Sequence, residues 1–150
     1  KNPDEYNLII LWSFRTIIRN IPSNNVILFH SADLPNGKGW APIYNSIESG
    51  QKFFTISGIL ANEEVDSGNI IVKARFKIKE NHTAEYIRRW DNEISIILIK
   101  KIMERFENKK IIGKKQSDRG TFYPRRKPED NEIDLQSRFI EKINHHIAKI

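Results

Sequence analysis

Two residues of this sequence, His30 and Asp66, have the chemical type and the surroundings for proton transfer. His30 directly follows the apolar run Val26–Phe29 and opens a loop with two glycines. If that run is a strand of an α/β sheet, His30 stands where such sheets bind ligands, and a histidine exchanges protons near neutral pH. Asp66 precedes a Ser-Gly pair and a second apolar run. Taken alone, each residue is more often structural, the histidine in a loop and the aspartate in a turn.

Three ordered motifs contain or follow this pair. They read FHSADLPNGKGWAP from Phe29, EVDSGNII from Glu64 and FYPRRKPED from Phe122, and Asp66 comes 36 positions after His30. Cationic and aromatic residues in the first and third motifs could bind a phosphorylated substrate or form the wall of a cleft. A solvated loop or simple packing explains them equally well. The candidate substrate-binding residues are Lys38, Trp40, Arg125 and Arg126, together with Gly39, which lies between the first two.

Together, the three motifs resemble the signatures of the 10-formyltetrahydrofolate-dependent formyltransferases, and the resemblance runs from about Asn7 to Asp134. It implies an α/β, Rossmann-like formyltransferase domain with a mainly parallel sheet. The chain looks like the C-terminal part of that catalytic domain, without its first βα units. We therefore expect residues 1–150 to form a single domain, with a basic loop region at 107–131.

The resemblance also implies an acyl-transfer mechanism. His30 would polarise the formyl oxygen or accept the proton of the substrate amine, and Asp66 would orient the imidazole. Relatives carry an oxyanion-binding Asn two residues before the histidine, where this chain has Leu28, so backbone N–H groups near Ser31 or a water would have to replace it. The implied co-substrate is 10-formyltetrahydrofolate, with no metal. The residues implied to bind it are Trp12, Ser13, Leu60, Ala61 and Asn62.

The elements that must position these residues can be predicted from apolar periodicity. Short apolar runs indicate strands at 7–13, 26–29 and 52–60, and clean alternation indicates a strand with one wet face at 70–79. Helices are expected at 14–20 (one or two turns), 42–49, 83–106 and 134–150. In the longest helix, an apolar stripe is predicted to pack in the core. Its members are Tyr86, Trp90, Ile94, Ile97, Leu98, Ile102 and Phe106.

Composition limits the classes of function. The 150 residues include no cysteine, which excludes thiolate catalysis and thiolate metal sites. The net charge is +6, which favours anionic partners. No apolar run of membrane-spanning length and no signal-peptide pattern is found, so a cytoplasmic protein is expected.

Three readings of function remain open. The leading one is an N-formyltransferase acting on the amine of a nucleotide-linked amino sugar, because the motif around Arg125 and Arg126 resembles that branch. The second is a methionyl-tRNA formyltransferase. The third is a non-catalytic module that binds anions or nucleic acid, although few aromatic residues interleave its basic segment. An apolar stripe on the last helix could form a homodimer contact.

Overall fold

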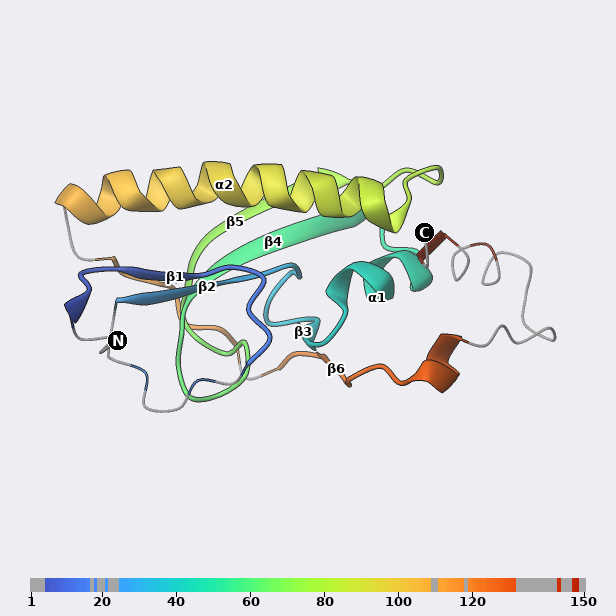
Figure 1. Cartoon of the computed structure of the whole chain (residues 1–150), viewed down its shortest axis with the longest axis horizontal. Helices are drawn as coiled ribbons and strands as arrows, with labels where there is room; N and C mark the ends of the chain where they lie inside the picture. Colours follow the sequence, from blue (N-terminus) through green and yellow to red (C-terminus); the bar gives the residue numbers. More distant parts are fainter. Residues whose placement is uncertain are drawn as a thin grey trace.

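A computed structural model of the chain describes residues 5–16, 18, 21, 25–108, 111–117, 119–131, 143 and 147–148. Its centre is a four-stranded sheet with the strand order β1-β2-β4-β5 (Figure 1). The strands are β1 (Ile9–Leu11), β2 (Val26–His30), β4 (Phe53–Leu60) and β5 (Ile70–Lys77). The α/β class is therefore confirmed.

The sheet is mixed in strand direction. β1 and β2 are parallel, as the two apolar runs predict, whereas β2 pairs with β4, and β4 with β5, in antiparallel fashion. The expectation of a mainly parallel sheet thus holds only for the first pair. The reason is that β4 and β5 follow each other through the loop 61–69, and an antiparallel edge can keep one face in water. On β5, Lys73, Arg75 and Lys77 are exposed, as predicted.

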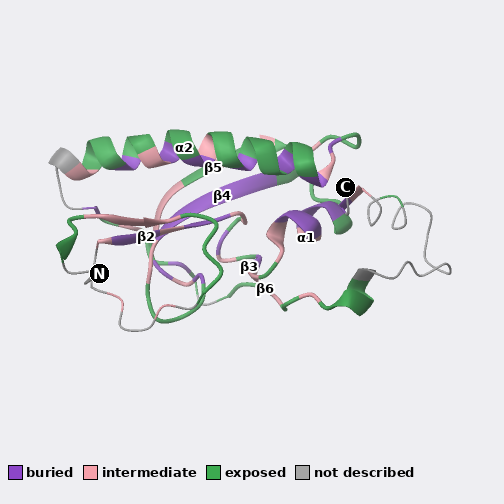
Figure 2. Ribbon diagram, in the orientation of Figure 1, coloured by how far each residue is buried: buried purple, intermediate pink, exposed green. Residues whose placement is uncertain are grey.

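The long helix α2 (Ala84–Asn108) lies along β4 and β5, with its buried face toward the sheet (Figures 1 and 2). The predicted stripe is only partly correct. Leu98 and Ile102 are buried, but Tyr86, Trp90 and Ile97 are exposed by 41%, 40% and 53%. The buried line is rotated and includes two polar residues. It consists of Ala84, Ile87, Asp91, Ser95, Leu98 and Ile102.

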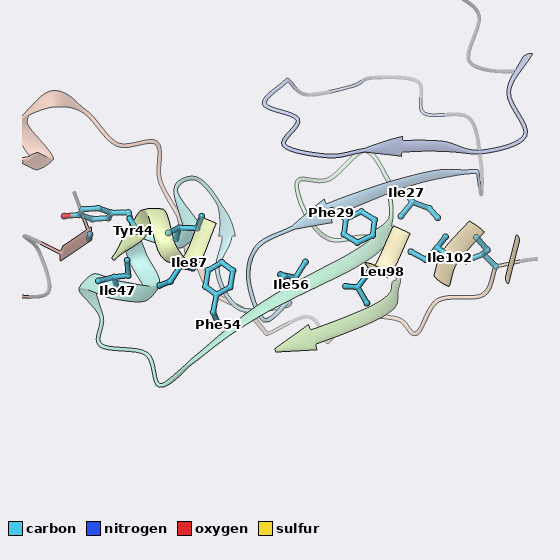
Figure 3. Packing of buried hydrophobic residues seen from close by; sticks show 13 residues of the cluster. Ile27, Phe29, Tyr44, Ile47, Phe54, Ile56, Ile87, Leu98 and Ile102 are labelled. Atoms are coloured by element: carbon cyan, nitrogen blue, oxygen red, sulfur yellow. The ribbon is translucent and has the colours of Figure 1, made fainter. Parts of the chain in front are cut away.

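The core lies between this helix and the sheet. Ile27 and Phe29 of β2 and Phe54 and Ile56 of β4 meet the buried side chains of α2 (Figure 3). The short helix α1 (Pro42–Glu48) adds Ile43, Tyr44 and Ile47 at one end. Burying one such side chain contributes roughly 1.5–3 kcal/mol, so this packing fixes the position of β2, at whose end His30 stands.

Smaller elements complete the described fold. β3 (Lys38–Gly39) and β6 (Phe122–Tyr123) form a parallel two-stranded sheet, and a 3-10 helix spans Pro128–Asn131. The described residues 14–16 are not helical, and the rest of the predicted helix at 14–20 lies largely outside the described residues. Most of the helix predicted at 134–150 also lies outside them.

Candidate active site

His30 is the last residue of β2, and its side chain is buried, with 8% of the residue exposed. Its Nε2 lies 2.7 Å from the carbonyl oxygen of Gly37, in the loop that follows β2. A carbonyl oxygen only accepts hydrogen bonds, so Nε2 carries the hydrogen in this contact. The other ring nitrogen, Nδ1, is left to face the loop that bears Asp66.

One carboxylate oxygen of Asp66 contacts both His30 and the loop that follows β2. Its Oδ2 lies 3.5 Å from His30 Nδ1 and accepts a 2.8 Å hydrogen bond from the backbone N–H of Gly39. The structure thus brings together the two residues selected from the sequence. In this geometry an imidazolium ring can donate to Gly37 and face the carboxylate at the same time, which is the arrangement that stabilises a ring that has accepted a proton.

The segment 113–123 ties both loops in place. Gln116 is buried and donates from Nε2 to the carbonyl oxygens of Asp66 (2.9 Å) and Gly68 (2.7 Å). Thr121 Oγ1 accepts the N–H of Gly37 at 2.8 Å, and β6 pairs with β3 beyond it. The residues on either side of the His30–Asp66 pair are therefore held by β6 and by Gln116 and Thr121, two residues that the sequence placed only in a basic loop region.

A cleft of about 1080 Å³ opens beside the pair and is lined by most of the predicted binding residues. His30 and Asp66 both line it. Of the residues predicted to bind folate, Trp12, Ser13, Ala61 and Asn62 line it and Leu60 does not. Of those predicted to bind substrate, Gly39, Trp40 and Arg126 line it, whereas Lys38 and Arg125 do not.

Backbone strain also concentrates at this cleft. In the described part of the chain, the non-glycine residues with positive φ are Ser13 (53°), Ala41 (48°) and Asp66 (51°), and all three line the cleft. Such conformations cost free energy and tend to persist at functional sites.

One wall of the cleft combines aromatic rings and guanidinium groups. Arg126 lies over the Tyr44 ring at 3.4 Å from its centroid, and Arg125, which does not itself line the cleft, lies over the Trp40 ring at 5.0 Å. The Tyr44 hydroxyl donates to Glu48 at 2.6 Å. Burial and the neighbouring Glu48 raise the pKa of Tyr44 to about 12, so this hydroxyl stays protonated. The wall can bind an anion that also offers a flat ring.

The sequence patterns did not indicate Asp91 as a residue of the cleft, and they indicated Ser31 only for the backbone N–H groups near it. Asp91 of α2 is buried, and its Oδ2 lies within hydrogen-bond distance of the Ser31 hydroxyl oxygen, at 2.8 Å. Burial raises the pKa of Asp91, although Ser31, Arg88 and His30 each act to lower it. A signal for Asp91 was available, because it stands seven positions before Leu98 on the buried line of the helix. Leu28 lines the cleft as well and offers no donor.

No cluster of three or more metal-ligating side chains occurs among the residues that the structure describes. Within the same residues, none of the helices has both the length and the apolar character needed to cross a membrane.

Solved structures with the same fold include two kinds of formyltransferase. An N-formyltransferase from Helicobacter canadensis, in complex with folinic acid and dTDP-3-aminofucose, matches with a TM-score of 0.83 and 24% identity over 93% of this chain and 53% of its own. A methionyl-tRNA formyltransferase from Clostridium thermocellum matches with a TM-score of 0.76 and 26% identity over 98% of this chain and 68% of its own.

Curated relatives and a family model agree with this likeness. The methionyl-tRNA formyltransferase of Wigglesworthia glossinidia brevipalpis is 35% identical over 61% of this chain, and that of Pelagibacter ubique is 32% identical over 79%. The chain spans only 29% and 40% of those two relatives. The model of the formyl transferase family matches residues 5–102. The chain therefore belongs to the formyl transferase family.

Proposed function

We propose that the protein transfers a formyl group from 10-formyltetrahydrofolate to the amine of a nucleotide-linked amino sugar. The observation that carries formyl transfer is the buried His30–Asp66 pair, with 3.5 Å between Nδ1 and Oδ2, at the edge of a cleft in a formyl transferase fold. Solved neighbours that contain folinic acid or tetrahydrofolate support the co-substrate.

The reaction needs one proton to move and no redox change. The amine nitrogen forms a bond to the formyl carbon, and the bond from that carbon to the folate nitrogen breaks. In our proposal a substrate group replaces the Gly37 carbonyl at His30 Nε2, and the neutral ring then carries its hydrogen on Nδ1, toward Asp66. The free Nε2 takes the amine proton and returns it to the departing folate nitrogen. Asp66 holds the charged ring meanwhile.

The two substrates are assigned to opposite parts of the cleft. Trp12, Ser13, Ala61 and Asn62 line the part proposed for the folate, and Leu60, the last residue of β4, precedes Ala61 in the chain without lining the cleft. The Tyr44–Arg126 wall is proposed to receive the nucleotide sugar, because guanidinium groups match phosphate geometry and an aromatic wall suits a base.

Methionyl-tRNA is the second candidate acceptor. Its support is that both curated relatives described above are methionyl-tRNA formyltransferases, with identities of 35% and 32%. The net charge of +6 suits either acceptor, since both carry phosphates.

The test is to follow conversion of 10-formyltetrahydrofolate to tetrahydrofolate by the full-length protein with each acceptor. A panel of dTDP- and UDP-linked amino sugars is compared with methionyl-tRNA. We expect turnover with at least one nucleotide sugar and none with the tRNA. Turnover with tRNA alone would overturn the sugar assignment, and no turnover with either would overturn formyl transfer to these acceptors.

A further inference from the structure

A second polar pair stands beside His30, on the side of the cleft formed by α2. Asp91 is 8% exposed, and its Oδ2 lies 2.8 Å from the hydroxyl oxygen of Ser31, the residue directly after His30. Both residues line the same cleft as the catalytic pair. The mechanism above uses neither of them.

The other carboxyl oxygen of Asp91 decides which residue donates in this hydrogen bond. Asp91 Oδ1 is buried and has no hydrogen-bond partner among the residues that the structure describes. If Asp91 were a carboxylate, part of a buried negative charge would be left unpaired, which is costly. If Asp91 is a neutral acid with its proton on Oδ2, the unpaired oxygen is an uncharged carbonyl, which is much cheaper to bury.

The charged groups around Asp91 do not reverse this conclusion. His30 of β2 and Arg88 of its own helix favour the carboxylate, as does the Ser31 hydroxyl. Burial outweighs them and raises the pKa of Asp91. A neutral Asp91 then donates to Ser31 Oγ, and the hydroxyl hydrogen of Ser31 is released to point elsewhere.

A donor is needed at this position. Formyl transfer passes through a tetrahedral intermediate whose oxygen carries negative charge, and such an oxygen needs hydrogen-bond donors. Leu28, two residues before His30, lines the cleft but cannot donate. Ser31 is adjacent to His30 in the chain and lines the cleft.

We propose that Ser31 is a catalytic residue that donates to the oxygen of the reacting formyl group, and that neutral Asp91 is the positioning residue that aims its hydroxyl. This inference rests on the proposed formyl transfer. It assigns a side-chain donor to a site in which the strand before His30 supplies none.

The kinetic test compares variants at both residues in the full-length protein. Ser31→Ala is expected to lower kcat by about 10²-fold, the usual effect of removing one oxyanion donor, with little change in KM. Asp91→Asn keeps an N–H donor toward Ser31 and should stay within about threefold of wild type, which is a small change in activation free energy. Asp91→Leu, of similar size but without a donor, should approach Ser31→Ala. Ser49→Ala removes an exposed hydroxyl bonded to Asn45 and serves as the matched serine control.

The dependence of kcat on pH separates this role from a merely structural one. Wild type should lose activity relative to Asp91→Asn as pH rises and Asp91 ionises; the His30 and Arg88 side chains are present in both proteins. Full activity of Ser31→Ala would overturn the proposal. So would an Asp91→Asn variant as slow as Ser31→Ala, because the carboxylate would then be the working form.

An infrared measurement tests the hydrogen bond between Asp91 and Ser31 in the protein alone, with no formyl-accepting substrate present. We expect a protonated carboxyl C=O band that persists above the ordinary pKa of aspartic acid, disappears in Asp91→Asn and shifts in Ser31→Ala. If wild type converts none of the formyl acceptors, the proposed function fails. Absence of the carboxyl band would contradict a neutral Asp91 whether or not formyl transfer is observed.

Discussion

The two sides of the cleft are built in different ways. On the loop side, His30 and Asp66 are fixed by backbone groups, namely the carbonyl of Gly37 and the N–H of Gly39, and the segment 113–123 holds both loops. On the helix side, Ser31 is the one hydrogen-bond partner of the Asp91 side chain among the described residues, and Asp91 is placed by the burial of α2. Position is thus set by hydrogen bonding on one side and by apolar packing on the other.

This difference predicts how each side fails. Changes in the loop side should disturb the geometry of His30 and Asp66 through a few specific contacts. Changes in the helix side should act through the stability of the whole domain, unless they touch Asp91 itself.

The largest effect on stability is expected at Gly39. Its φ is +92°, and an added Cβ would lie about 2.4 Å from the backbone oxygen of Tyr123. Gly39→Ala should therefore separate β3 from β6 and lower the free energy of unfolding by roughly 3 kcal/mol or more. Urea denaturation checks this, with the exposed Asn36→Ala in the same loop as control. Unchanged stability would mean that the β3–β6 pairing does not hold the loop.

The helix side is tested by two neighbouring apolar residues of α2. Leu98 is 4% exposed and Ile97 is 53% exposed. Leu98→Ala should cost about 2–5 kcal/mol, whereas Ile97→Ala should cost well under half of that. Thermal and urea unfolding of both variants measure the contrast. Equal losses would contradict the orientation of the helix.

Gln116 should show a smaller effect that reaches the active site. Gln116→Ala removes two hydrogen bonds to the Asp66 loop and is expected to lower stability by about 2 kcal/mol, with a fall in kcat. Ser117→Ala, at an exposed neighbouring residue, should change stability by less than about 0.5 kcal/mol. A Gln116 variant with a wild-type rate would show that the loop holds its own shape.

The smallest effect concerns the dependence of stability on pH. Because the pKa of Asp91 is raised by burial, the folded protein holds this proton more tightly than the unfolded chain does. Its contribution to stability is full below the ordinary pKa of aspartic acid and is lost as pH rises through the raised value. Asp91→Asn should therefore gain stability relative to wild type as pH rises from the ordinary pKa of aspartic acid through the raised pKa of Asp91. A pH-independent difference would contradict a shifted Asp91.

Local sequence patterns predicted much of the fold. Apolar runs, alternation and helical periodicity predicted the helix α1, the strands β2, β4 and β5 and the long helix α2. The antiparallel pairing of β2 with β4 was not predicted, because an apolar run does not encode the direction of its partner. The stripe on α2 was misplaced because Asp91 and Ser95, which are polar, occupy buried positions.

The candidate site, like the fold, was predicted only in part. The pairing of His30 with Asp66 could be predicted because flanking motifs mark both residues. The part played by Gln116 and Thr121 could not, because their contacts cross 50 and 84 positions of sequence. Lys38 and Arg125 carry a suitable charge, but charge alone does not show whether a side chain reaches the cleft.

The most direct test of the account is a double-mutant cycle on kcat for formyl transfer with wild type, His30→Ala, Asp66→Ala and the double variant. Each single change should lower kcat by roughly 10²–10⁴-fold. If the residues act as one unit, the double variant should be about as slow as the slower single variant. A wild-type rate in either single variant, or losses that multiply in the double variant, would contradict the pairing of His30 with Asp66 as the catalytic unit.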